Sequence, residues 1–255
     1  MNNRNYGLTI VVPTLNEEDN VELLTNRIST SMNNAGIDYH ILFIDDHSED
    51  KTVPNIMRLS RSHPVSVMLK AGKPGKAYSI LEGIKHSDTE LICMIDADLQ
   101  YPPEEIPVMV KLLVDNNADV VLSSRIDNET SLLRRVVSKG YNLVFTRLLF
   151  GIHYDTQSGL KVFRKQVFHN MRLNPSPWSF DLEFIVECLR RDYRILTHDI
   201  AFGTRHSGEP KINVMTASIE IAKASVKLRA KIPGGIIKDA YRRNARFNSA
   251  VSETL

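Results

Sequence analysis

A chain of 255 residues, 42% hydrophobic and 24% charged, has the composition of a globular protein with a sizeable core. Its formal net charge of +2 gives no support for nucleic-acid binding, so nucleic acid is not an expected partner. The two cysteines, Cys93 and Cys188, lie in apolar runs without metal-ligand spacing, which argues against a disulfide framework and predicts buried core thiols.

The N-terminus shows no signal-peptide pattern, because Arg4 and Asn5 lead directly into a predicted strand. The longest uncharged apolar stretches, such as Gly140–Thr146, fall far short of the roughly 18 residues that a membrane-spanning helix needs. We therefore expect a cytoplasmic protein that can lie on a membrane but does not cross it.

Short apolar runs rich in β-branched residues predict five strands in the first half: Leu8–Val12, Ile41–Ile44, Val65–Leu69, Leu91–Ile95 and Val120–Ser123. Their continuous hydrophobicity is typical of a parallel sheet that is covered on both faces. Helical patterns lie between them. Glu17–Asp19 are predicted to form the first turn of one helix, where the helix dipole favours negative charge, and another helix is predicted to begin at Pro103.

The second half is less regular. It predicts helices at Leu132–Phe150, Phe180–Arg191 and Val214–Leu228, strands at Gly159–Phe163 and Ile195–Phe202, and a frayed polar end at Asn248–Leu255. The alternation of strands and helices predicts the α/β class, with an open, mostly parallel, Rossmann-like sheet flanked by helices. Such sheets bind ligands at the carboxyl ends of their strands.

Two carboxylates, Asp96 and Asp98, follow the predicted strand Leu91–Ile95 directly, and Gln100 comes two residues later. Mg²⁺ and Mn²⁺ prefer such oxygen ligands together with substrate phosphates. A cation held there would neutralise a diphosphate leaving group. Taken alone, the Asp-x-Asp sequence fits a metal site and a solvated acidic turn about equally well.

Carboxylates also follow the first two predicted strands, with Glu17 after the first and Asp45 and Asp46 after the second. Carboxylates at such positions can accept hydrogen bonds from ribose hydroxyls or base nitrogens. In isolation, however, the pattern favours a simpler role for Asp45, Ser48 and Asp50 as caps of the next helix.

Taken in order, these motifs resemble the family 2 glycosyltransferases, and within them the branch of dolichol-phosphate mannose and glucose synthases and their bacterial relatives. The segments that carry the resemblance are Val12–Glu17, Asp45–Thr52, Gly75–Gly83, Asp96–Gln100, Tyr101–Pro103, Asp155–Gly159 with Phe163 and Arg164, and Arg205–Lys211. The resemblance covers residues 8 to about 230.

The resemblance implies an inverting enzyme of the GT-A type, with a nucleotide-binding half at about 1–125 and an acceptor half at about 126–230. The expected nucleotide-site residues are Pro13, Leu15, Glu17, Asp45, Asp46, Gly75, Lys76, Asp96, Ser138 and Arg205. Asp96, Asp98 and Gln100 would hold Mg²⁺ or Mn²⁺, and Asp96, Asp98, Arg125 and Arg134 are the expected catalytic residues. Arg125, Arg134 with Ser138, and Arg205 would receive a lipid phosphate, since the arginine fork matches phosphate bidentately.

Several positions keep two interpretations. Lys76 either contacts the nucleotide or faces water. Glu183 is expected to be structural or to contact the acceptor region, and Trp178 either stacks on a sugar or packs in the core. Pro210 stands where the family usually has Ser, which puts phosphate contacts by Glu209–Lys211 in doubt.

Eight basic residues and one acid, Asp239, lie between Lys223 and Arg246. Residues 231–255 are therefore expected to form a basic helical tail that contacts an anionic membrane surface, although a solvated helix face has the same pattern.

The resemblance implies transfer of a hexose from a nucleotide-sugar of the GDP-mannose or UDP-glucose type to a polyprenyl phosphate, on the cytoplasmic face of a membrane, with or without a membrane-anchoring subunit. The alternatives are a family 2 enzyme with another sugar or glycan acceptor, a sugar nucleotidyltransferase, and a non-catalytic binding module.

Overall fold

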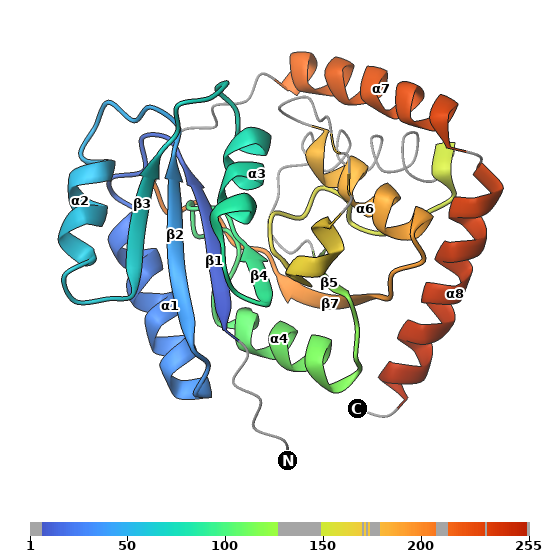
Figure 1. Ribbon diagram of the computed structural model, residues 1–255, viewed down its shortest axis with the longest axis horizontal. Coiled ribbons are helices and arrows are strands. Elements are labelled where there is room, and N and C mark those ends of the chain that lie inside the picture. Colours follow the sequence, from blue (N-terminus) through green and yellow to red (C-terminus); the bar gives the residue numbers. More distant parts are fainter. Residues whose placement is uncertain are drawn as a thin grey trace.

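The computed structural model describes residues 7–126, 149–169, 171, 173, 179–207, 214–232 and 234–253. Within these residues a seven-stranded sheet has the order β3-β2-β1-β4-β6-β5-β7 (Figure 1). The strands are β1 (Leu8–Thr14), β2 (Tyr39–Asp45), β3 (Val65–Leu69), β4 (Leu91–Met94), β5 (Val120–Ile126), β6 (Lys161–Arg164) and β7 (Ile195–Ala201). Each strand predicted from the sequence overlaps one of them.

The sheet is mostly parallel. β1 pairs in parallel with β2 and with β4, β2 pairs in parallel with β3, and β5 pairs in parallel with β7. β6 is antiparallel to both of its neighbours, β4 and β5, and thereby joins the two parallel groups. This arrangement confirms the predicted α/β sheet and brings the carboxyl ends of β1, β2 and β4 to one edge.

Helices cover both faces of the sheet. α1 (Val21–Ala35), α2 (Thr52–Leu59) and α4 (Glu105–Asp115) pack on one face, while α3 (Lys76–His86) and α6 (Phe180–Arg190) pack on the other. Alternate residues of β1 therefore enter different cores: Ile10 and Val12 meet the first group of helices, and Val11 meets the second. Burial on both faces explains the unbroken apolar runs in the sequence.

Two helices begin later than predicted. α1 begins at Val21, because the chain before it is tied to the neighbouring loop: the Glu17 N–H donates to Thr52 Oγ1 (2.7 Å) and the Glu18 N–H to Asp50 Oδ2 (3.1 Å). α4 begins at Glu105, and Pro103 lies in the preceding turn, where its carbonyl accepts from the Ile106 N–H (3.1 Å).

The C-terminal part of the described chain consists of α7 (Val214–Lys231) and α8 (Gly234–Ser252), which in Figure 1 lie along the top and the right-hand side. A short 3-10 helix, η2 (Lys165–Phe168), follows β6. Of the predicted helix Leu132–Phe150, only Leu149 and Phe150 lie within the described residues, and both are helical. None of the helices that the structure describes combines the length and hydrophobicity needed to cross a bilayer.

α8 packs against the free edge of β7, with Ile237 and Ala240 buried. The Asn244 side chain accepts from the Ile195 N–H (2.7 Å), and the Asn248 side chain accepts from the Thr197 N–H (2.8 Å). The frayed end predicted from Asn248 is therefore wrong as far as Ser252, because these asparagine amides replace a neighbouring strand.

Both cysteines are buried and unpaired, as predicted. Burial raises the pKa of both thiols well above the ordinary range, as expected for inert core residues.

Candidate functional site

Among the described residues, several that are expected to carry chemistry follow β1, β2 and β4, at the edge of the sheet where these strands end. The loop after β4 contains Asp96, Asp98 and Gln100, and the loops after β1 and β2 lie beside it because these strands are neighbours in the sheet. The sequence therefore placed the candidate site at the edge where open α/β sheets bind ligands.

The Asp96–Asp98 loop is held in a specific shape. Leu99 has a positive φ of 62°, and the turn lets the Gln100 N–H donate to Asp98 Oδ1 (3.2 Å). Gly159 packs against Asp96 so closely that a Cβ there would lie 2.4 Å from Asp96 Oδ2. Burial, together with the neighbouring charge of Asp96, raises the pKa of Asp98 to about 6.

Each of these carboxylates is paired with a cation from the chain itself. Lys76 Nζ lies 2.5 Å from Asp96 Oδ1, and Arg205 Nη2 lies 2.9 Å from Asp98 Oδ2. Burial acts to lower the pKa of Lys76, but Asp96 and Asp181 outweigh it and raise this pKa above its ordinary value. Lys76 therefore contacts Asp96 directly, an arrangement that neither interpretation from the sequence contained.

The segment 203–207 fastens this loop to the loop after β1. The Gln100 side chain donates to the Gly203 carbonyl (3.3 Å), and the Gly203 N–H donates to the Gln100 carbonyl (2.9 Å). At the other end, Ser207 Oγ donates to Asp19 (2.9 Å), and the Asn20 amide donates to the Ser207 carbonyl (3.3 Å). Hydrogen bonds before and after Arg205 in the chain therefore hold it beside Asp98.

Asp45 and Asp46, at the end of β2, make different contacts within the chain. Asp45 accepts from the N–H (2.9 Å) and the Oγ (2.5 Å) of Ser48, which agrees with the simpler role in shaping the loop. Asp46 lies 2.6 Å from the buried Nζ of Lys70 and accepts from the Gly75 N–H (2.6 Å). Burial acts to raise the pKa of Asp46, but the bonds from Lys70 and Gly75 outweigh it and hold this pKa below its ordinary value.

The remaining residues predicted for the nucleotide site lie along the end of β1 and the loop that follows. Pro13 pairs with Ile44 in the sheet, Leu15 is 36% exposed, and Glu17 accepts from the Asn20 side chain (2.6 Å). An exposed leucine beside carboxylates offers an apolar surface to a flat ring and acceptors to hydroxyl groups.

Near the end of β5, the Arg125 side chain is paired with Asp155. Its Nε and Nη2 atoms lie 2.6 and 2.8 Å from the two carboxylate oxygens, and the guanidinium lies 5.2 Å from the centre of the Phe202 ring. This fork geometry fixes the orientation of the guanidinium. Arg134, Ser138, Trp178, Glu209, Pro210 and Lys211 lie outside the described residues.

Two buried lysines beside the site were missed from the sequence. Lys161 is completely buried, and its ammonium contacts the Ser158 carbonyl and Asp181 Oδ1 (2.5 Å). Lys70 holds Asp46 in the same way. The signal that could have revealed them is a single lysine within or directly after an apolar strand, since a charge buried at such a position needs a partner.

The donor set fits Mg²⁺ or Mn²⁺. Among the described residues no group of three or more His, Cys, Asp or Glu side chains gathers as a metal cluster, so an all-protein cage is absent from that part of the chain. Two carboxylates and a glutamine at a strand end fit a cation that completes its shell with water and substrate phosphates.

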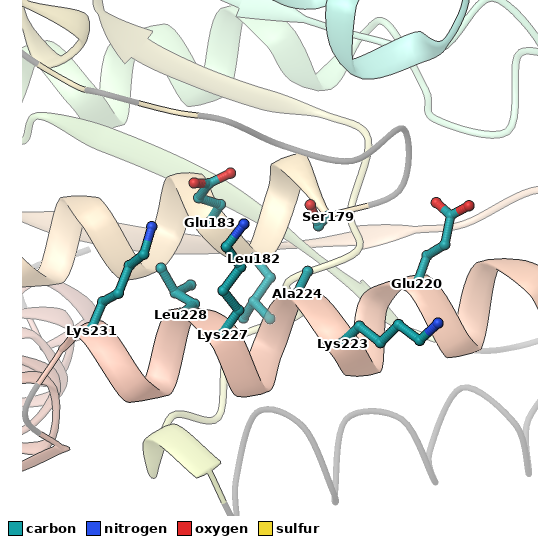
Figure 2. Close-up of a pocket in the computed structure, with 9 residues that line it drawn as sticks. All are labelled: Ser179, Leu182, Glu183, Glu220, Lys223, Ala224, Lys227, Leu228 and Lys231. Atoms are coloured by element: carbon teal, nitrogen blue, oxygen red, sulfur yellow. The ribbon is translucent and has the colours of Figure 1, made fainter.

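A pocket of about 290 Å³ lies between α6 and α7 (Figure 2). Its lining residues are Ser179, Leu182, Glu183, Glu220, Lys223, Ala224, Lys227, Leu228 and Lys231. Lys227 and Lys231 point toward α6, while Leu182 and Leu228 supply apolar lining (Figure 2). The pocket thus combines an apolar floor with a rim of exposed ammonium groups.

Residues 9–172 match the family model described as Glycosyl transferase family 2. A dolichol-phosphate mannosyltransferase from Pyrococcus furiosus is 30% identical over 82% of this chain and 60% of its own length. An undecaprenyl-phosphate 4-deoxy-4-formamido-L-arabinose transferase from Salmonella paratyphi B is 33% identical over 64% of this chain and 50% of its own length. The chain therefore spans 50 to 60% of the length of these relatives.

The fold is also similar to that of solved structures. Glucosyl-3-phosphoglycerate synthase from Mycobacterium tuberculosis, in complex with Mn²⁺, uridine-diphosphate-glucose and phosphoglyceric acid, superposes with a TM-score of 0.71. The match covers 89% of this chain and 81% of that one at 18% identity, so it bears on the fold alone.

Proposed function

Because the chain belongs to glycosyl transferase family 2, we propose that it transfers a hexose from a nucleotide-sugar to a polyprenyl phosphate. Membership in this family confirms the resemblance that the sequence motifs indicated. The names of both relatives describe sugar transfer to a polyprenyl phosphate, and this supports the acceptor class. The donor is proposed to be of the GDP-mannose or UDP-glucose type.

The observation that carries the proposal is the pair Asp96 and Asp98 at the end of β4, packed against Gly159 and faced by Lys76 and Arg205. Asp96, Asp98 and Gln100 would hold Mg²⁺ or Mn²⁺, which supplies positive charge to the leaving diphosphate. The side chains of Lys76 and Arg205 add two more positive charges at the same edge. Such a site suits departure of a nucleoside diphosphate.

Pro13, Leu15 and Glu17 would line the nucleoside pocket, with Asp45 and Asp46 beneath them. Both carboxylates are buried and already bonded within the chain. Asp46 is held by Lys70 and Gly75, and Asp45 accepts two hydrogen bonds from Ser48. We therefore expect both to support the loop more than to read the base, and Glu17 is the better candidate for contacts with ribose or base.

An anionic acceptor changes what catalysis requires. A phosphate oxygen is already a nucleophile near neutral pH: it forms the bond to the anomeric carbon as the bond to the diphosphate breaks, with inversion and without a proton to remove. Arg125 and Arg205, together with Arg134 and Ser138, would position this phosphate. Asp181 is paired with the buried Lys161 (2.5 Å), and the proposed chemistry requires no general base from it.

The lipid tail of such an acceptor requires contact with a membrane. The exposed Lys223, Lys227 and Lys231 and the basic α8 support a peripheral position on an anionic, cytoplasmic membrane surface, at about 1 kcal/mol for each basic residue near the lipid.

A transfer assay tests the proposal. Purified protein, a short-chain polyprenyl phosphate and Mg²⁺ or Mn²⁺ would be offered a panel of labelled UDP- and GDP-sugars, with Asp98→Ala as control. A lipid-extractable product that requires metal and is lost in the variant is the expected result, and it identifies the donor. Failure with every donor, also after native membranes are added, would refute the proposed acceptor. Water-soluble phosphorylated and glycan acceptors in the same panel test the alternative acceptors.

A further inference from the structure

Lys76 occupies the place where a cation bound to Asp96 would have to be. Its ammonium lies 2.5 Å from Asp96 Oδ1, and both side chains are partly buried, at 32% and 24% exposure. Asp98, by contrast, is paired with Arg205, which comes from a different segment of the chain. The acidic pair therefore already carries two counter-ions before any ligand arrives.

The backbone beneath Lys76 is fixed, so only the side chain can give way. The Gly75 N–H donates to Asp46 Oδ2 (2.6 Å), and the Gly75 carbonyl accepts from Lys70 Nζ (3.1 Å). Both partners are buried, and α3 starts at Lys76 itself. Lys76 thus stands on a rigid base, while four flexible methylene groups carry its ammonium.

A divalent cation and the ammonium cannot share Asp96 without repulsion, because both are positive and would lie within a few ångströms of each other in a partly buried site. If the Lys76 ammonium simply moved off Asp96, it would still lie close to the incoming cation. A diphosphate relieves this conflict, because its negative charge attracts the displaced ammonium and the cation together. Asp181 also attracts the Lys76 ammonium, so a second carboxylate lies on its side of the site.

We propose that Lys76 is the resident counter-ion of Asp96, and that it yields this carboxylate to a divalent cation only when a nucleoside diphosphate group arrives with it. The cation and the nucleotide then bind with positive cooperativity, and Lys76 passes from the carboxylate to the diphosphate. The inference rests on the proposed function, since it assumes that the site takes a nucleotide and a metal.

The test measures Mn²⁺ binding by the loss of the electron paramagnetic resonance signal of free Mn²⁺, with and without UDP or GDP. The wild type is expected to bind Mn²⁺ alone weakly and to bind it far better with the nucleotide. Lys76→Met should tighten the binding of Mn²⁺ alone by about tenfold and reduce the effect of the nucleotide, a change within the usual range of coupling between two ligands.

Two further variants test whether the change in Mn²⁺ binding comes from loss of the Lys76–Asp96 ion pair. Lys73 is exposed in the same loop, so Lys73→Met removes the same charge without touching Asp96 and should behave like the wild type. Lys76→Arg keeps a cation beside Asp96 and should keep Mn²⁺ binding dependent on the nucleotide.

The outcomes distinguish this inference from the proposed function. If Lys76→Met and the wild type show the same Mn²⁺ affinity and the same effect of the nucleotide, the counter-ion role is refuted while the nucleotide site stands. Tight Mn²⁺ binding by the wild type without nucleotide refutes it as well. If no protein binds UDP or GDP in the presence of Mn²⁺, the proposed function fails together with the inference.

Discussion

At the scale of single residues, Gly159 shows how a missing side chain shapes the site. A Cβ there would lie 2.4 Å from Asp96 Oδ2 and 2.9 Å from Tyr101 Cε2, and Tyr101 is buried in the core. Gly159→Ala should therefore displace Asp96, weaken nucleotide-dependent Mn²⁺ binding at least tenfold, and lower the free energy of unfolding by about 1–3 kcal/mol through overpacking.

Mn²⁺ titration and urea denaturation measure the two effects. Gly72→Ala is the matched control, because the nearest atom that its Cβ would meet is Glu82 Oε2 at 4.0 Å. Equal Mn²⁺ binding by Gly159→Ala and Gly72→Ala would show that Asp96 does not depend on this contact.

The ion pair of Asp46 and Lys70 predicts a dependence of stability on pH. The folded protein holds the pKa of Asp46 below its ordinary value, so the carboxylate stabilises the fold above that ordinary value, about 3.9. This stability is lost as the pH falls through the lower, folded pKa. Asp46→Asn should lower the free energy of unfolding near pH 7 by about 3–5 kcal/mol, because it leaves Lys70 buried without its charged partner.

Urea denaturation between about pH 2 and pH 7 measures this, and the difference between wild type and Asp46→Asn should shrink toward the acid end. Asp115→Asn removes an exposed carboxylate paired with Lys111 and should cost at most about 1 kcal/mol. A constant difference across the pH range would contradict the assignment.

At the scale of elements, α8 completes the edge of the sheet through side-chain amides. Asn244 accepts from the Ile195 N–H (2.7 Å) and donates to the Tyr193 carbonyl (3.2 Å), so its removal leaves two backbone groups unpaired. Asn244→Ala should lower the free energy of unfolding by about 1–3 kcal/mol. Thermal and urea denaturation measure this, with Ser249→Ala on the exposed side of the same helix as control. Equal stabilities would mean that α8 contributes through its apolar face alone.

The strands could be predicted from the sequence, because burial on both faces of the sheet requires continuous apolar runs. The carboxylates at their ends could be predicted because they come directly after these runs. The start of α1 could not, since it depends on bonds from Glu17 and Glu18 to the loop after β2. The sequence predicted a frayed end from Asn248. An asparagine whose side chain bonds to the edge of a strand cannot be distinguished, in the sequence, from any polar surface residue.

The sequence did not predict which side chains form ion pairs with the site residues. Asp96 and Asp98 could be located from the strand that precedes them. Their pairing with Lys76 and Arg205 depends on α3 and on the segment after β7, which only the fold brings to them. The clamp of Asp155 on Arg125 was hidden for the same reason.

At the scale of the whole molecule, the lysine rim of the α6–α7 pocket tests the membrane position. Lys227→Gln combined with Lys231→Gln should weaken binding to vesicles that contain anionic lipid by roughly 2 kcal/mol, about 1 for each charge. Co-sedimentation at low salt measures this. Lys51→Gln with Lys73→Gln removes two exposed charges from the other half of the molecule and should have little effect. An equal loss of vesicle binding in both double variants would indicate a general electrostatic attraction and not a single membrane-facing surface.

The antiparallel strand β6 has a consequence for synthesis on the ribosome. β6 lies between β4 and β5, yet β4 and β5 both precede it in the chain. The edge of β4 therefore stays open, and β5 has no place in the sheet, until Lys161–Arg164 have left the exit tunnel. A nascent chain that stops near Ile126 should thus self-associate along β4, so residues 1–126 are not expected to survive as a separate soluble fragment.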